Sequence, residues 1–303
     1  MASSCWGLPE LICQFPALPD KTLRLMRMGI DNGFRGIVRH YSDQIDAATR
    51  PLQWFLNTLE NAFTNTPWFI VLAVILTVVW LASRSIKIVI GSAIGMCLIG
   101  VFGLWEDTMT TLAMVAVATM IAIALGLPIG ILAARSDRFQ SVLSPILDVM
   151  QTMPSFVYLI PVVVIFGIGK VPGVIAVVIY AVPPMIRLTN LGIRLVDKEV
   201  IEAADAFGAN SRQKLWGVQL PLSLPTIMAG VNQTIMMALA MVVVASMVGV
   251  GGLGKNVLQA INNQFFTIGF LNGFALVAIA IIFDRASQAF GKRLQKHSEA
   301  GHD

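Results

Sequence analysis

The chain has 303 residues, of which 56% are hydrophobic and only 13% are charged, and its mean hydropathy is +0.76. Soluble domains carry about 25% charged residues, so this composition places the chain in a lipid bilayer. The net charge of +4 comes from basic residues in separate short loops and not from one stripe, which argues against a nucleic-acid surface.

Residues 1–66 differ from the rest, because they carry six basic and six acidic residues and no apolar run of span length. We expect a soluble or interfacial tail. Apolar side chains recur at helical spacing over about 51–59, which predicts a short helix. This helix either lies on the membrane surface or packs on its own protein, and the sequence leaves both open.

From Pro67 onward, apolar runs of about 20 residues recur, the length that crosses about 30 Å of hydrocarbon. We expect an all-α, polytopic transmembrane protein with about seven spans. They cover about 67–83, 87–105, 108–134, 142–169, 171–188, 224–249 and 266–283. The fourth contains Pro145, Pro154 and Pro161, and interior proline removes a helix hydrogen bond, so it should be kinked or broken and could hide an eighth span.

The placement of Lys and Arg in the short loops predicts the orientation. Basic residues follow the first, third, fifth and seventh expected spans, while the alternate loops hold Glu106 with Asp107, a lone Lys170 and a lone Lys255. The loop after the fifth span and the C-terminus, 291–303, are therefore expected in the cytoplasm. An odd number of spans then puts the tail 1–66 on the outside.

The loop between the fifth and sixth spans, 189–223, carries a spaced motif. It reads Glu202-Ala203-Ala204, three residues, Gly208, nine residues, and then Val218, Gln219, Leu220 and Pro221. This pattern resembles the cytoplasmic signature of ABC importer permeases. One fixed position departs from it, because Val218 stands where isoleucine is usual.

The chemistry of the loop suits a docking helix independently of the resemblance. Acidic groups lie near its expected start, at Asp197, Glu199 and Glu202, where they favour the positive end of the helix dipole. Small side chains follow, at Ala203, Ala204 and Ala206. Gly208 can take the left-handed conformation that ends a helix. The alternative, an ordinary amphipathic connector, does not account for the long fixed spacing to Leu220 and Pro221.

The resemblance extends over about 106–290, with 67–105 as two accessory spans. Segments 126–130, 150–158, 166–169, 183–187, 225–234 and 245–254 look like the permease of glycine betaine and proline betaine importers. This implies a bacterial inner-membrane protein whose motif residues couple it to a separate ATP-binding subunit, present in two copies, that binds ATP and Mg. It further implies a second copy of this chain and an external substrate-binding protein. Choline or another quaternary amine, or histidine, stays open as the substrate.

Several residues within the expected spans have two interpretations. Gln151, Thr152, Asn232, Gln233 and Thr234 are uncharged polar residues that either join helices or line a translocation path. Tyr158 could face a quaternary ammonium cation, although core aromatics are commoner. Asp148, inside or at the edge of the fourth span, either has a functional role, since ionisable groups are costly there, or lies near the cytoplasmic interface, hydrogen-bonded to a neighbouring helix. We favour the second.

The segment Gly249 to Lys255 contains most of the pattern of a phosphate-binding loop, but the residue after it does not fit. The following residue is Asn256, not the Ser or Thr that holds Mg²⁺, so a glycine-rich turn is expected instead. The three histidines and three cysteines show no catalytic or metal-ligand spacing, so we expect no enzyme, no metal site and no cofactor in this chain. The competing function is a stand-alone ion-coupled transporter, which predicts inverted repeats and charged pairs within spans.

Overall fold

The computed structural model describes residues 18–299, and in that part of the chain every regular element is a helix. The α-helices are α2 Asp20–His40, α3 Ser42–Thr64, α4 Trp68–Ser83, α5 Ile86–Val101, α6 Trp105–Arg135, α7 Asp137–Thr152, α8 Ser155–Phe166, α9 Lys170–Arg194, α10 Lys198–Ala206, α11 Ser211–Lys214, α12 Leu220–Ala245, α13 Leu253–Asn263 and α14 Phe266–Glu299. A π-helical turn, Leu215–Gln219, precedes α12, and a 3₁₀ turn, Ser246–Val248, follows it. The chain divides into two units, 1–48 and 49–303.

The unit that ends at Ala48 contains α2 and the first residues of α3. Helix α2 carries Asp20 in its first turn and Arg39 and His40 in its last, which matches the direction of the helix dipole. Leu25 and Ile30 are exposed apolar residues on this helix.

In the larger unit, the expected short helix at 51–59 is only part of α3, so the prediction was too short. The reason is that the apolar spacing continues to Phe63. Leu56 is buried in the hydrophobic core, and Leu52, Leu59 and Phe63 pack against it. Of the two alternatives for this segment, the structure therefore supports the helix packed on its own protein.

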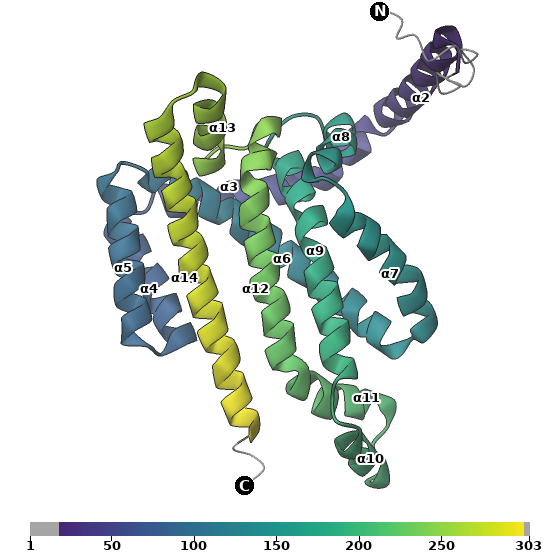
Figure 1. The fold of residues 1–303 in the computed structure, drawn as a ribbon, viewed down its shortest axis with the longest axis vertical. Helices are drawn as coiled ribbons and strands as arrows, with labels where there is room; N and C mark the ends of the chain where they lie inside the picture. The colour runs from purple at the N-terminus through teal and green to yellow at the C-terminus, as the bar shows by residue number, and fades with distance from the viewer. Residues whose placement is uncertain (1–17, 300–303) are drawn as a thin grey trace, which may run out of the picture. The chain divides into compact units, whose positions relative to one another are not determined.

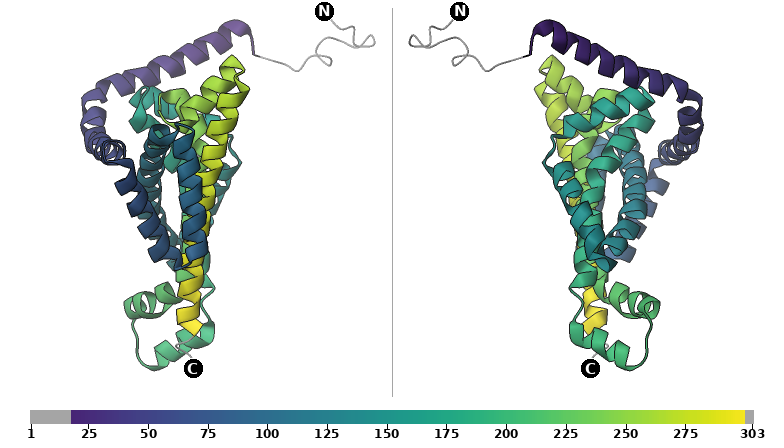
Figure 2. Two further views of the ribbon diagram at one scale, coloured as in Figure 1. Left: turned by 90° about the vertical axis from the view of Figure 1, so that its left-hand side faces the viewer. Right: turned by 90° about the vertical axis from the view of Figure 1, so that its right-hand side faces the viewer.

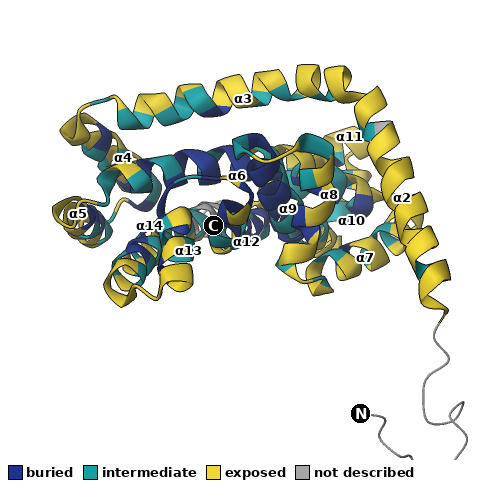
Figure 3. Cartoon of the chain, turned by 90° about the horizontal axis from the view of Figure 1, so that it is seen from above, coloured by how far each residue is buried: buried dark blue, intermediate teal, exposed yellow. Residues whose placement is uncertain are grey.

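Helix α9 lies at the centre of the larger unit, between α6 and α12, and most of its apolar stretch is buried. Figures 1 and 3 show these helices side by side, with the buried residues concentrated along α6 and α9 and the exposed ones on α4 and α5. Glycines permit the close approach of α6 to α9. A Cβ atom at Gly126 would lie 2.8 Å from Met185, and one at Gly130 would lie 2.6 Å from Thr189.

The structure contains four described helices that are long and apolar enough to cross a membrane, α6, α9, the helix from Ser211 to Val248, and α14. Two bent pairs raise this to six if each pair is one span: α3 with α4 at 108° and α7 with α8 at 100°. Helix α5 is a shorter apolar helix. The expectation of about seven spans agrees with this arrangement.

The predicted break in the fourth span lies between α7 and α8. Pro154 precedes the first residue of α8, while Pro145 and Pro161 lie inside helices. The hydroxyl group of Tyr158 donates a hydrogen bond to the carbonyl oxygen of Met150, so it joins the two sides of the bend. Only one of the three prolines therefore marks the break.

The glycine-rich segment after α12 is a turn, as expected, since Gly249 and Gly252 have φ angles of +96° and +86°. It leads into α13, an amphipathic helix for which the sequence analysis made no prediction. The buried hydroxyl group of Thr111 on α6 accepts a hydrogen bond from the amide of Leu253 at 2.9 Å, which seats the start of α13.

Candidate functional site

Helix α10 begins with acidic residues, as the sequence predicted, although Glu202 lies beyond its first turn. The carboxylate of Asp197 accepts a hydrogen bond from the amide of Glu199 at 2.9 Å, and Glu199 adds a negative charge in the first turn. Glu202 and Ala203 are exposed, and Ala204 is half-buried. No residue of this nine-residue helix is buried, although helices shorter than about 12 residues are marginal alone in water. Most of its surface, including Glu202 and Ala203, is therefore left uncovered by the described part of the chain.

The end of α10 exposes an aromatic side chain beside a glycine turn. Gly208 has a φ of +77°, and its amide donates a hydrogen bond to the carbonyl oxygen of Asp205 at 2.9 Å. Phe207 is 93% exposed. Figure 2 shows α10 and α11 beyond the end of the long helices, at the same end of the larger unit as the last turns of α14. The loop thus projects from the bundle with an apolar group at its tip.

The return of the loop to the bundle is held by two contacts. Asn210 and Gln213 form a capping box around α11, and Lys214 forms an ion pair with Asp205 at 2.6 Å. The loop was expected over 189–223, but α9 continues to Arg194 and α12 begins at Leu220. The connecting segment is therefore 195–219, and both helices extend past the ends of the apolar runs. The polar end of α9 stays helical because Arg194 bonds the Ala133 carbonyl at 2.9 Å and the Asp137 carboxylate at 2.7 Å.

The later residues of the motif lie at the junction of this loop with α12. Val218 and Leu220 are half-buried in and just after the π-helical turn, and Pro221 is exposed in the first turn of α12. All seven motif residues therefore lie in one loop and its attachment to the bundle.

The six residues predicted for a translocation path lie in two separate groups. Gln151 and Thr152 are exposed at the end of α7, near the bend that Tyr158 braces. Tyr158 is buried, with its ring edge-on to Tyr180 at 6.1 Å. An aromatic side chain used in this way holds two helices together, which is the commoner of its two expected roles.

The second group lies on α12. Asn232 is half-buried and donates a hydrogen bond to the Asp284 carboxylate of α14 at 3.0 Å. Gln233 is exposed, and Thr234 is buried with no hydrogen-bond partner for its hydroxyl among the described residues. Asn232 and Gln233 both line a hollow between α12 and α14.

Two ion pairs join helices of the bundle. Asp148 of α7 forms an ion pair with Arg187 of α9, in agreement with the expected bond to a neighbouring helix. Lys170, at the start of α9, binds Glu60 of α3 at 2.5 Å. The sequence analysis did not find this second pair, because the partners are 110 residues apart and no spacing signal connects them.

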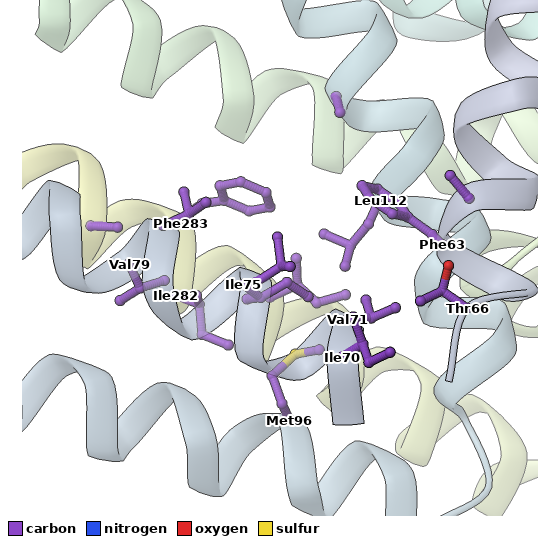
Figure 4. Close-up of a pocket in the computed structure, with 16 residues that line it drawn as sticks. Phe63, Thr66, Ile70, Val71, Ile75, Val79, Met96, Leu112, Ile282 and Phe283 are labelled. Atoms are coloured by element: carbon purple, nitrogen blue, oxygen red, sulfur yellow. The ribbon is translucent and has the colours of Figure 1, made fainter. Parts of the chain in front are cut away.

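An apolar hollow of the larger unit lies between α3, α4, α6 and α14. Its cavity volume is about 410 Å³, and its wall carries Thr66 as the single polar side chain. Figure 4 shows Phe63, Ile75, Leu112 and Phe283 around it, with the Thr66 oxygen at one end. A charged or zwitterionic solute would lose its hydration there without compensation, so this hollow does not suit a path for such a solute.

Comparisons with known proteins agree with the helical fold and with the resemblance to importer permeases. The family model of the binding-protein-dependent transport system inner membrane component matches residues 126–296. The glycine betaine/proline betaine transport system permease protein ProW of Escherichia coli (strain K12) is 43% identical over 272 residues, 90% of this chain and 77% of that protein. The glycine betaine/carnitine transport permease protein GbuB of Listeria monocytogenes is 44% identical over 262 residues, which cover 86% of this chain and 91% of that protein.

A solved structure supports the fold. A chain of the MetNI methionine ABC transporter, in inward facing conformations, superposes with a TM-score of 0.57 and 23% identity over 61% of this chain and 93% of that chain. The match of the family model over more than half of the sequence, together with the identity to two permeases, decides the family. The chain belongs to the binding-protein-dependent transport system inner membrane components.

Proposed function

We propose that this chain is the permease subunit of an ATP-driven importer for glycine betaine, proline betaine or a related quaternary amine. The observation that carries the proposal is α10, a capped helix without buried residues that projects from a bundle of membrane-length helices. Such a helix needs a partner surface, and the motif around Glu202 and Gly208 resembles the site where importer permeases contact their ATPase.

The loop has the mechanical properties that coupling requires. The left-handed Gly208 fixes the direction of the chain after α10, and the ion pair of Asp205 with Lys214 joins α10 to α11. The π-helical turn then continues directly into α12. A displacement of α10 by an ATPase would therefore be transmitted to α12, which packs on α9 through close contacts at Gly192 and Gly230.

The assembly that we propose contains two copies of this chain, two ATP-binding subunits and one external substrate-binding protein. ATP and Mg belong to the ATP-binding subunits. The permease domain covers 106–290 with its coupling loop at 189–223, preceded by the tail 1–66 and two accessory spans in 67–105. The coupling loop and the tail 291–303 face the cytoplasm, and residues 1–66 face the outside, as the distribution of Lys and Arg favours.

The substrate class rests on the relatives, whose names combine glycine betaine with proline betaine or carnitine. A compound of this class carries a quaternary ammonium group, so a path with weakly polar walls and a few carboxylate or amide oxygens suits it. Specificity is expected in the pocket of the binding protein, which is a separate chain.

Two measurements test the proposal. The tagged chain, purified from its native membrane in mild detergent, should retain an ATPase whose hydrolysis rises when the loaded binding protein is added. Calorimetry on that binding protein should detect glycine betaine, proline betaine or choline and not histidine. A chain that purifies without an ATPase and takes up solute in response to a proton or sodium gradient would contradict the proposal.

A further inference from the structure

A polar pocket lies between α12 and α14, at the level where both helices approach the α10 end of the bundle. Its volume is about 480 Å³, within the range of about 300–1,000 Å³ that small-molecule sites occupy. The wall contains Pro225, Met228, Ala229, Asn232, Gln233, Met236, Ser287, Gln288, Gly291 and Lys292. Polar side chains are costly within spans, so their concentration here calls for a role.

One carboxylate organises the polar side of this pocket. Asp284 bonds two of the lining residues, because its Oδ1 atom accepts hydrogen bonds from the side-chain amides of Asn232 at 3.0 Å and Gln288 at 2.6 Å. The hydroxyl group of Ser287 donates to the Asn232 side-chain oxygen at 2.5 Å. No salt bridge to Asp284 occurs among the described residues, and the side-chain groups that bond its carboxylate there are neutral amides.

This bonding pattern determines what the wall presents. Because the Gln288 side-chain NH₂ group is bound to Asp284, its amide oxygen is the end left to accept contacts from a solute. The pocket therefore has a negative region around Asp284 and Gln288. A cation of low hydration energy is the solute that such a region attracts.

The other end of the pocket carries the opposite charge. Lys292 is exposed and lies four residues after Gln288 on α14, a separation of about 6 Å along the axis and on the same helix face. A solute that bears both a positive and a negative group a few ångströms apart can satisfy both ends. A simple cation can satisfy only one.

We propose that the α12–α14 pocket is a transit site for a small zwitterion, with the quaternary ammonium group on the side of Asp284 and Gln288 and the carboxylate group beside Lys292. The proposal rests on the function proposed above and adds the residues that handle the substrate inside the permease. Asp284 acts as a positioning residue, because it acts through the amides of Asn232 and Gln288.

The test uses thiol-reactive probes of opposite charge on the assembled complex of this chain with its ATPase. Cys5, Cys13 and Cys97 are first replaced by serine, and Gln233→Cys is then introduced in the pocket wall. The probes are trimethylammonium-ethyl and sulfonatoethyl methanethiosulfonate. We expect Asp284→Asn to lower the cationic rate and Lys292→Gln to lower the anionic rate, each by about three- to tenfold. Asp284→Glu, which keeps the charge, should keep the cationic rate.

Glycine betaine should slow the labelling of Gln233→Cys. Ser141→Cys, an exposed position on α7 away from the pocket, is the control, and neither the charge substitutions nor glycine betaine should alter its rates. Equal rates before and after both charge substitutions, an absence of labelling at Gln233→Cys, or a lack of protection by glycine betaine would overturn the proposal.

The outcome is separable from that of the proposed function. ATP-driven uptake by the unaltered complex tests the importer, whereas the probe rates test the pocket without requiring transport. If the importer works and the probe rates do not respond to charge, only the transit site is wrong. If uptake is absent, the importer itself is wrong, whatever the probes report.

Discussion

Gly208 is the residue whose backbone conformation matters most for the coupling loop. Its φ of +77° costs a residue with a Cβ atom about 1–2 kcal/mol, while the space around it is open, since a Cβ there would meet no atom within 4 Å. A substitution therefore acts through strain and not through a clash. We expect Gly208→Val to reduce ATP-driven uptake about tenfold or more with normal insertion into the membrane.

The matched variant is Gly208→Asn, because asparagine tolerates the left-handed region better than other residues with a side chain. It should retain much more uptake than Gly208→Val. Membrane fractionation with an immunoblot gives the amount inserted, and uptake is divided by that amount. Equal, normal uptake in both variants would show that the turn at Gly208 has no part in coupling.

Phe207 is the residue that we expect to make the main apolar contact with the ATPase. Burying a phenylalanine side chain contributes about 1.5–3 kcal/mol, so Phe207→Ala should lower the amount of co-purifying ATPase about tenfold or more. Phe266→Ala is the control, since Phe266 is 81% exposed but lies at the start of α14, at the opposite end of the bundle. Equal retention of the ATPase by both variants would place the contact elsewhere.

Individual residue roles were only partly predictable from the sequence. The acidic start of α10 and its end at the left-handed Gly208 follow from local chemistry, and the structure confirms both. The ion pair of Glu60 with Lys170 depends on tertiary packing between distant segments, so no local pattern contains it. The same limit explains why Asn232 could be identified as a candidate but not its partner Asp284.

At the scale of the helices, the close packing of α6 on α9 is the contact most sensitive to side-chain volume. A Cβ atom at Gly130 would lie 2.6 Å from the Thr189 Cβ and 2.8 Å from the Ile186 carbonyl oxygen. Backbone atoms cannot move away as a flexible side chain can, so Gly130→Ala should destabilise the protein by about 1–3 kcal/mol. That corresponds to a thermal midpoint lower by about 2 °C or more.

Gly95→Ala is the matched control for this packing prediction. A Cβ atom there would lie 3.8 Å from Ile282 Cδ1, an ordinary contact, and alanine favours helix more than glycine does. Its midpoint should be unchanged or higher when both variants are heated in the same detergent. A midpoint for Gly130→Ala equal to that of the unaltered chain would show that α6 and α9 are not packed as closely as described.

The observed helix boundaries agree with the predicted ones where the length of an apolar run determines them. The spans from α4 to α6 were predicted within a few residues, because hydropathy marks them. The break in the fourth span was predicted, but its place at Pro154 could not be chosen among the three prolines. Helix α13 was not predicted, since a short amphipathic helix after a glycine turn has no span-length signal. Its apolar residues Leu253, Val257, Leu258 and Ile261 recur at helical spacing and could have revealed it.

At the scale of the whole molecule, the family, the all-helical fold and the membrane location were predictable, because composition and one spaced motif determine them. The orientation across the membrane remains a prediction from the Lys and Arg distribution. The assembly also remains a proposal, since a partner surface cannot be read from a single chain. The orientation and the assembly are tested together by asking whether ATP, supplied in the compartment that α10 faces, drives transport.

ATP-driven uptake in proteoliposomes is the measurement that tests this directly. The vesicles contain this chain, its ATPase and ATP in the compartment that α10 faces, and the binding protein loaded with radiolabelled glycine betaine is added on the opposite side. We predict uptake that requires ATP, the ATPase and the binding protein together. Uptake by this chain alone under a proton or sodium gradient, undiminished without ATP, would contradict it.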